Sequence, residues 1–267
     1  MIVDACWRGE PGTGSPTAVV DDDAGLTDAD RARAPADLGV SHAVFVDRAA
    51  PVRSLRFFTA AGELPACGHA TLAAVAVLED WDGRDDWLLR TPGRTFKAGT
   101  TAEGAFFDAG VSGHRVPAAG EAAPVLAALG AVPAGAVHAA GGARERLLVP
   151  VEADRLGALV PDFGALAAAC DAAGLLGCFV YAPVREGWFA ARMFAPSIGV
   201  PEDAANANST AALAGVLAGD GPGSVRVVVS MGESVGAPSR IRAEAFPAAG
   251  GARVHVVGRV GPPRGVG

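Results

Sequence analysis

Two segments of the chain combine small and polar residues with an apolar run that follows at once, and both are predicted helix starts. They lie at residues 67–71 (CGHAT) and 202–209 (EDAANANS). The first turn of a helix presents free backbone N–H groups and the positive end of the helix dipole, which together bind anions. Because small residues let a ligand approach the backbone closely, each start can hold a carboxylate without a lysine or arginine. In the alternative interpretation, polar residues here only cap their helices, the candidates being Thr71, Asp203, Asn206 and Ser209.

Both helix starts occur in a duplicated context. An Arg-x-Phe motif, then six residues and a proline, spans residues 56–65 and again residues 192–201, about half of the 267-residue chain further on. The alanine-rich runs that follow, 70–78 and 210–218, are apolar on nearly every side. Such a pattern is typical of a helix enclosed within a protein, because a surface helix shows one polar face. We therefore predict one unit duplicated, with each helix inside a curved sheet.

The rest of each half is predicted to be strand-rich, with few helices. Outer helices are expected at 122–129 and 163–173, and the Gly, Ser and Pro residues of 110–120 indicate a linker or crossover. The predicted lobes are therefore residues 1–113 and 114–267, and the final strand is allowed to return to the first lobe. The strand predictions are 2–7, 18–20, 42–47, 55–59, 87–90 and 104–108, then 146–151, 178–183, 188–194, 225–230, 240–245 and 253–257.

Composition excludes several classes of function. Half of the residues are hydrophobic and 19% are charged, which favours a folded core. The net charge of −7 argues against a nucleic-acid partner. The longest strongly apolar stretches fall short of the roughly 20 residues that cross a bilayer, so we expect no membrane partner. Residues 1–7 lack the pattern of a signal peptide, and the four cysteines match no metal or CxxC spacing, so we expect a cytoplasmic protein without a metal site.

The motifs around the helix starts resemble the PhzF family of phenazine biosynthesis, within the diaminopimelate epimerase-like superfamily. The resemblance runs in order from near residue 10 to near residue 258. It implies an α/β fold of two similar lobes, each wrapping a barrel-like sheet around a central helix, with the site in the cleft between them. It also implies a cofactor-independent isomerase that moves a proton on a small carboxylic acid, commonly as a homodimer. The matching segments are 14–20 (GSPTAVV), 55–59 (LRFFT), 63–74 (ELPACGHATLAA), 192–196 (RMFAP), 199–203 (GVPED) and 236–239 (GAPS).

One departure from the family pattern falls on the main catalytic group. Where the phenazine enzyme has a Ser-Glu pair supplying the general acid and base, this chain has Ser41-His42. A histidine, with an ordinary pKa of about 6.5, can take and return a proton near neutral pH. In the alternative interpretation His42, on the same strand face as Val44 and Val46, is an inward histidine bonded to a backbone carbonyl. We favour the catalytic role.

A second departure follows Asp203, which the chain keeps. The family's usual Pro-Ala-Thr-Gly-Ser run is replaced by residues 204–208 (AANAN), so Asn208 stands where a pocket serine is expected. Both changes favour a substrate other than the phenazine precursor. The related epimerases use two facing cysteines, whereas here only the first half supplies one, Cys67. A two-thiol racemase is therefore not expected, although Cys67 working with His42 or Asp203 stays open.

We expect an isomerase that shifts a proton by 1,3 or 1,5 transfer in secondary metabolism, and a 4-alkylproline-type diene acid of antibiotic biosynthesis is the preferred substrate class. The alternatives are isomerisation of the phenazine precursor dihydrohydroxyanthranilate, epimerisation at an α-carbon, and a non-catalytic metabolite-binding protein. No cofactor is expected. The catalytic candidates are His42, Asp203 and His69. The substrate-binding candidates are Ser15, Ser41, Cys67, Gly68, Ala70, Asn206, Ala207, Asn208 and Ser209.

Overall fold

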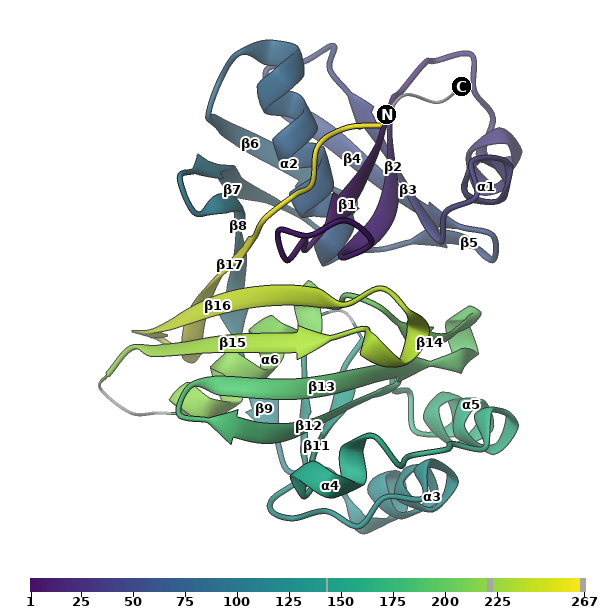
Figure 1. The fold of residues 1–267 in the computed structure, drawn as a ribbon, viewed down its shortest axis with the longest axis vertical. Helices are drawn as coiled ribbons and strands as arrows, with labels where there is room; N and C mark the ends of the chain where they lie inside the picture. The colour runs from purple at the N-terminus through teal and green to yellow at the C-terminus, as the bar shows by residue number, and fades with distance from the viewer. Residues whose placement is uncertain (143, 220–222, 265–267) are drawn as a thin grey trace.

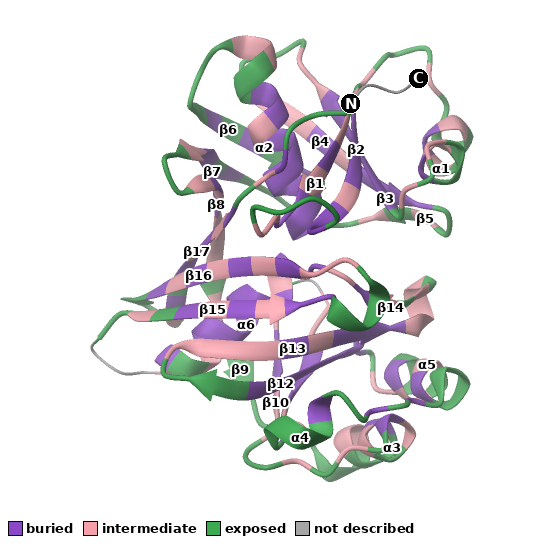
Figure 2. Cartoon of the chain, in the orientation of Figure 1, coloured by how far each residue is buried: buried purple, intermediate pink, exposed green. Residues whose placement is uncertain are grey.

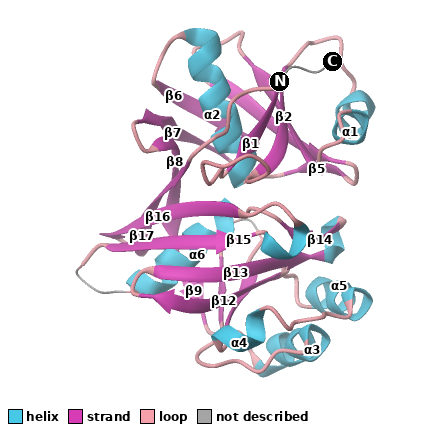
Figure 3. Ribbon diagram, viewed as in Figure 1, coloured by secondary structure: helices cyan, strands magenta, loops and turns pink. Residues whose placement is uncertain are grey.

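A computed structural model describes residues 1–142, 144–219 and 223–264, and it consists mainly of strands (Figures 1 and 3). The strands are β1 (Ile2–Ala5), β2 (Ser15–Asp21), β3 (His42–Asp47), β4 (Arg53–Thr59), β5 (Gly62–Leu64), β6 (Asp86–Thr91), β7 (Arg94–Thr101), β8 (Gly104–Ser112), β9 (His114–Arg115), β10 (His138–Ala140), β11 (Arg146–Pro150), β12 (Cys178–Arg185), β13 (Trp188–Ala195), β14 (Val200–Asp203), β15 (Val225–Met231), β16 (Ser239–Ala248) and β17 (Gly251–Gly258). The helices are α1 (Asp28–Asp37), α2 (Gly68–Asp82), α3 (Ala119–Leu129), α4 (Ala153–Leu156), α5 (Phe163–Ala172) and α6 (Ala207–Ala218), with short 3₁₀ turns at Pro196–Ile198 and Glu233–Val235.

Helices α2 and α6 are the central elements of two groups of strands, one above the other in Figure 1. Strands β1, β2, β3, β7 and β8 pack against α2, and strands β8, β15, β16 and β17 pack against α6. Both helices are buried over most of their length (Figure 2). The prediction that both apolar runs are enclosed helices is confirmed. Burial on all sides accounts for their composition, since alanine and leucine fill the space within a closed sheet without leaving polar atoms unpaired.

The duplication is visible in the strand pairing. In the first half β2 pairs in parallel with β3, β3 pairs antiparallel with β4, and β4 pairs antiparallel with β5 and in parallel with β6. In the second half β11, β12, β13, β14 and β15 repeat the same order of parallel and antiparallel pairs. Each half thus carries its enclosed helix after the same short strand, β5 or β14. Equivalent topology brings the two helix starts to equivalent positions.

The connection between the halves differs from the predicted linker. Residues 110–112 belong to β8, which pairs antiparallel with β17, so only Gly113 separates β8 from β9. A bulge opposite Val254 and His255 accommodates Gly110, whose φ of 86° is in the left-handed region. Glycine here therefore marks an irregular strand rather than a loop. The lobe boundary near residue 113 stays a prediction, and residues 265–267 of the second predicted lobe lie outside the described part of the chain.

The chain returns to its beginning after β17, where isolated bridges join Ile2 to Arg264 and Ala5 to Val260. The predicted outer helices are confirmed as α3 and α5, which pack on each other. Helix α1 and strand β7 were not predicted. Thr27 caps α1, because its Oγ1 accepts a hydrogen bond from the Asp30 N–H at 3.2 Å. Over the described ranges, no helix has the length and hydropathy needed to cross a membrane.

Candidate active site

The starts of α2 and α6 meet in van der Waals contact beside a cavity of about 490 Å³. A Cβ atom on Gly68 would lie 2.7 Å from Cβ of Ala207 and 2.9 Å from Oδ1 of Asn208, so the approach requires glycine at this position. The cavity volume falls within the range of sites for small molecules, which is about 300–1,000 Å³. Both halves therefore contribute one helix start to a single site.

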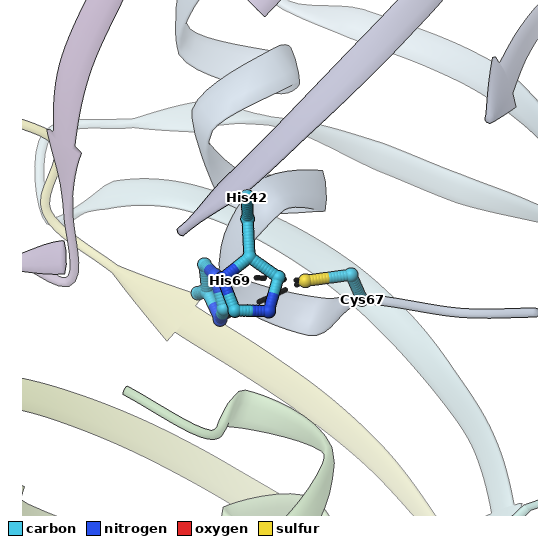
Figure 4. Close-up of side chains that lie close together, drawn as sticks. All are labelled: His42, Cys67 and His69. Carbon is cyan, nitrogen blue, oxygen red and sulfur yellow. Dashed lines mark hydrogen bonds between the residues drawn. The ribbon is translucent and has the colours of Figure 1, made fainter. Parts of the chain in front are cut away.

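Three side chains of the first half converge at this point (Figure 4). His42 begins β3, Cys67 precedes the first residue of α2, and His69 lies in the first turn of that helix. The imidazole rings of His42 and His69 are perpendicular, with centroids 4.4 Å apart, and Cys67 Sγ lies 3.6 and 3.7 Å from the two ring nitrogens of His69. The exposed fractions of His42, Cys67 and His69 are only 4%, 6% and 1%, so water is largely excluded from the cluster.

Asp203 brings a buried carboxylate from the second half to the same cluster. Its Oδ1 accepts a hydrogen bond from the Ala205 N–H at 3.2 Å, and its Oδ2 accepts one from Asn206 Nδ2 at 2.9 Å. Asn206 Oδ1 in turn accepts a hydrogen bond from the Ser209 N–H at 2.9 Å, which caps α6. The capping interpretation is therefore correct for Asn206, and the same amide also fixes the position of the Asp203 carboxylate.

The environment separates the pKa values of the two histidines. Burial and the neighbouring His69 ring lower the pKa of His42 to about 4, although Asp203 acts in the opposite direction. Burial also acts to lower the pKa of His69, but the Cys67 sulfur, the Asp203 carboxylate and a hydrogen bond to the Ala205 backbone outweigh it and raise this pKa to about 9. At neutral pH His42 is therefore neutral and His69 is a cation. Such a separated pair supplies a proton acceptor beside a proton donor.

The two helix starts differ in how their N–H groups are satisfied. In α2 no side chain caps the first turn, because Thr71 Oγ1 donates a hydrogen bond to the Cys67 carbonyl at 2.8 Å instead of accepting from an N–H. The capping interpretation is therefore wrong for Thr71. In α6 the Ser209 N–H is used by Asn206, and the turn before it lines the cavity. The α2 start is thus the more open of the two anion-binding positions.

The repeated Arg-x-Phe motif supports the strand and loop that lead into each helix. Arg56 forms a two-pronged ion pair with Glu63, at 2.8 and 2.7 Å, and Arg192 forms the same pair with Glu202, at 2.9 and 2.8 Å. Each guanidinium also lies over the phenylalanine two residues later, with carbon-to-centroid distances of 5.1 and 4.9 Å. Planar fork-to-fork pairing fixes orientation as well as distance. The motif thus has a positioning role in both halves.

The structure brings most of the predicted site residues together. Those lining the cavity are His42, Cys67, Gly68, His69, Asp203, Asn206, Ala207 and Asn208. Ser41 is exposed outside the cavity wall, and its Oγ lies 2.9 Å from Nδ1 of His42, so it touches the site only through that ring. Ser15, Ala70 and Ser209 are buried but do not line the cavity. Ser15 lies two residues before Thr17, which is the strand partner of His42.

Sequence reasoning missed Arg146, which lines the cavity with an exposed fraction of 5%. The only signal was a single arginine at the start of an otherwise apolar strand, Arg146–Pro150, where a charged side chain needs a reason to be buried.

A second pair of histidines, His114 and His138, is isolated in the sequence. Strand β9 pairs with β10, and this pairing brings the centroids of the two rings to 5.2 Å from each other.

The cluster also has the spacing of a metal site. One ligand atom each from His42, Cys67 and His69 lies within 4.8 Å of the others, an arrangement that suits a soft divalent cation such as zinc. In the described part of the chain these three are the group that meets this spacing. The expectation that the protein binds no metal therefore stays a prediction, and metal analysis of the purified protein tests it.

Comparison with known proteins agrees with this geometry. The family model of phenazine biosynthesis-like proteins matches residues 4–260. The chain belongs to this family. A trans-2,3-dihydro-3-hydroxyanthranilate isomerase of Pseudomonas fluorescens is 30% identical over 256 residues, covering 92% of this chain and 89% of the relative. An uncharacterized isomerase of Deinococcus radiodurans is 30% identical over 262 residues, covering 90% and 84% of the two chains.

The fold of this phenazine biosynthesis-like protein is likewise that of its family. A crystal structure of a PhzF-family protein of Bacillus anthracis matches 97% of this chain and 95% of its own, with a TM-score of 0.80 at 16% identity. The prediction of the diaminopimelate epimerase-like fold is confirmed. The sequence-based assignment to the isomerase class is also confirmed, since both relatives are isomerases and this chain matches most of the length of each.

Proposed function

We propose that the protein is a cofactor-independent isomerase that moves a proton, by a 1,3 or 1,5 shift, within a small unsaturated carboxylic or amino acid. The observation that supports this most is the buried contact between His42 and His69, whose ring centroids lie 4.4 Å apart in the wall of the cavity, together with surroundings that lower the pKa of His42 and raise that of His69. A shift of a proton between two carbons needs one group that accepts and another that stabilises the charge left behind.

His42 is the proposed proton shuttle. It is neutral near pH 7, and Ser41 Oγ at 2.9 Å from Nδ1 leaves Nε2 for the substrate. A neutral imidazole nitrogen has the lone pair that proton abstraction requires. After abstraction the imidazolium would lie near the Asp203 carboxylate, which favours the charged ring. The proton can then return to a different carbon of the same molecule.

His69 and Asp203 are proposed to orient the substrate and to hold the charge that develops. His69 is the cation of the pair, with Cys67 Sγ at 3.6 Å and the Ala205 backbone fixing its ring. The uncapped N–H groups at the start of α2 would bind the carboxylate, so that the enolate-like state forms beside fixed dipoles. In a buried cavity such dipoles act more strongly than in water. This chemistry uses only groups of the chain itself.

The preferred substrate class is a conjugated diene acid of the 4-alkylproline type, within a secondary pathway such as antibiotic biosynthesis. The reason is that the family glutamate is His42 here and a family serine is Asn208, which alters both the acid–base group and the second anion cradle. Isomerisation of dihydrohydroxyanthranilate, the activity of the Pseudomonas relative, is the alternative, together with epimerisation at an α-carbon. Cys67 is the residue that an epimerisation would use.

Proton NMR in deuterated buffer tests the proposal. The purified protein is incubated separately with the phenazine precursor, a 4-alkylidene proline-type acid and diaminopimelate, alongside His42→Ala and Cys67→Ala. Deuterium incorporation at one carbon of one compound, lost in His42→Ala and reduced but still present in Cys67→Ala, is the expected result, because Cys67 supports the His69 cation whereas His42 accepts the proton. Incorporation lost only in Cys67→Ala would reject the role of His42 in favour of a thiol base. No incorporation with any compound, from folded protein, would favour a binding protein without catalysis.

The cellular context is part of the same proposal. We expect the enzyme to act in the cytoplasm as a homodimer, as the phenazine enzyme usually does. Light scattering coupled to size exclusion distinguishes a dimer from the 26.6 kDa monomer. A monomer with full activity would reject the dimer without affecting the proposed chemistry.

A further inference from the structure

Arg146 is a charged side chain in the wall of the cavity that the proposed mechanism does not use. It begins β11 and is 5% exposed. Nη1 donates to the Asn208 carbonyl and Nη2 to the Arg144 carbonyl, both at the long distance of 3.5 Å, and Nε is buried without a hydrogen-bond partner. Within the described ranges no carboxylate forms an ion pair with this guanidinium, and burial is the one influence on its pKa. A planar group with five N–H donors is thus mostly unsatisfied.

Other arginines of the protein have hydrogen-bond partners at normal distances. Arg192 is paired with Glu202 at 2.8 Å. Two further arginines line the cavity, and both are bonded to backbone carbonyls at normal distances. Arg94 donates to the Ala109 and Asp108 carbonyls at 2.6 and 2.7 Å, and Arg144 donates to the Leu175 carbonyl at 2.7 Å. Arg146 therefore differs from its neighbours in being buried and unpaired.

The backbone next to Arg146 leaves space for its guanidinium. Gly141 has a φ of 130°, a conformation that favours glycine, and the absence of a Cβ there leaves space for the guanidinium, since a Cβ would overlap Nη1 of Arg146. Burial lowers the pKa of Arg146 to about 10, which leaves the side chain charged at neutral pH. Burying an unpaired charge is unfavourable in a protein without a ligand, so the partner is expected to come from outside the chain.

We infer that Arg146 is the anchor for the carboxylate of the substrate, which it binds together with the uncapped start of α2. The inference rests on the proposed function and names the residue that selects an acid. The contact of Nη1 with the Asn208 carbonyl puts the guanidinium beside the first turn of α6, and Gly68 at the start of α2 meets that same turn, so we expect one anion to reach both the guanidinium and the start of α2. A guanidinium fork matches the two oxygens of a carboxylate. The sequence-based expectation that helix starts hold the acid without an arginine is revised accordingly.

The test uses thermal unfolding with simple anions. Sodium benzoate and sodium acetate are compared with sodium chloride at equal ionic strength, and benzamide is the neutral match for benzoate. Wild type is run beside Arg146→Met and beside Arg144→Met, whose arginine lines the same cavity but is already bonded. Benzoate is expected to raise the Tm of wild type and of Arg144→Met, with affinity reduced about tenfold or more in Arg146→Met, the loss expected for hydrogen bonds to a charged group. Benzamide should shift none of them.

A structural role for Arg146 predicts different outcomes. If the side chain only holds the strand in place, Arg146→Met lowers the Tm of the ligand-free protein, whereas removal of an unpaired buried charge raises it. An equal benzoate response in wild type and Arg146→Met, or no response in wild type, would overturn the inference. Should Arg146→Met not fold, Arg146→Lys is expected to keep the charge but bind benzoate more weakly than wild type, because one ammonium replaces the fork.

The two proposals fail separately. If benzoate binding depends on Arg146 but no compound exchanges a proton, the isomerase proposal fails and the anchor stands. If exchange occurs and Arg146→Met keeps the wild-type KM, the anchor fails alone.

Discussion

Substitution of Gly68 by alanine tests whether the contact between the two helix starts sets the geometry of the site. The added Cβ would lie 2.7 Å from Cβ of Ala207, 2.9 Å from Oδ1 of Asn208 and 3.1 Å from the Asn208 nitrogen. Two of these three atoms are fixed by the backbone of α6, so a side-chain rotation cannot relieve the overlap. The starts of α2 and α6 must therefore move apart.

The size of the movement follows from the contact distances. Carbon atoms are in optimal contact at about 3.5–4.0 Å, so the two helices would separate by roughly 1 Å. A displacement of that size in a catalytic arrangement costs about 100-fold in rate. Overpacking costs about 1–3 kcal/mol, and because Gly68 is the first residue of α2 the gain in helix propensity on changing it to alanine is small, so we expect a loss of about 1–3 kcal/mol in the free energy of unfolding.

The assay compares kcat/KM for deuterium incorporation with urea unfolding of the same samples. Gly258→Ala is the matched control, because its Cβ would also meet a carbon at 2.7 Å, namely Cδ1 of Leu72, but away from the cavity lining. We expect Gly258→Ala to lose stability and to keep its rate within about threefold, since the far end of a leucine can shift. A folded Gly68→Ala enzyme with wild-type kcat/KM would refute the reasoning.

Three other predictions concern the acid–base pair and the frame around it. The pH profile of kcat/KM should be bell-shaped, falling below about pH 4 as His42 becomes protonated and above about pH 9 as His69 loses its proton. The His69→Gln variant should lose the fall at high pH. A profile with a single limb near pH 6.5 would contradict the assignment. The rate of His42→Ala should be about 10²- to 10⁴-fold lower than that of wild type. The His42→Glu variant, which supplies the carboxylate found in the family, should recover part of the lost rate in the same NMR assay. Equal rates for the two variants would reject proton transfer at this position. Arg192→Met should cost about 3 kcal/mol in urea unfolding, because the Glu202 carboxylate, whose side chain is only 9% exposed, would keep a hydrogen bond from Ser234 but lose its counter-charge. Arg226→Met, at an exposed pair with Glu244, should cost under about 1 kcal/mol, and similar losses in the two variants would contradict the positioning role.

Strands and enclosed helices could be predicted because their patterns depend on burial alone. Both ends of the strand from His42 to Asp47 were predicted correctly, since a short apolar run bounded by polar residues is typical of a buried strand. Strand β7 was missed because only three of its eight residues are buried, Phe96 and the small residues Ala98 and Gly99, which leaves a polar sequence. Helix α1 contains Pro35 and little apolar surface, although the Thr27 and Asp30 capping box was a usable signal.

The site was predicted less completely, because proximity across the fold is not encoded in spacing. The motifs placed His69 and Asp203 in one site, but Ser15 was carried over by resemblance alone and is buried outside the cavity lining. Arg146 shows the opposite case. Its one local signal, an arginine that begins an otherwise apolar strand, is also compatible with a side chain at the surface, and only the fold shows that its guanidinium is buried with Nε unpartnered.

The exchange of glutamate for histidine at position 42 also changes the charge of the cavity. A glutamate there would add a second carboxylate near Asp203, whereas His42 with a pKa of about 4 is neutral at pH 7. With His69 and Arg146 both cationic, the cavity holds more positive charge than a glutamate at this position would allow. A protein with a net charge of −7 thereby offers a locally cationic site. Replacing the base with an imidazole and burying an unpaired arginine therefore act in the same direction, toward an acid held tightly at one end while a proton moves at the other.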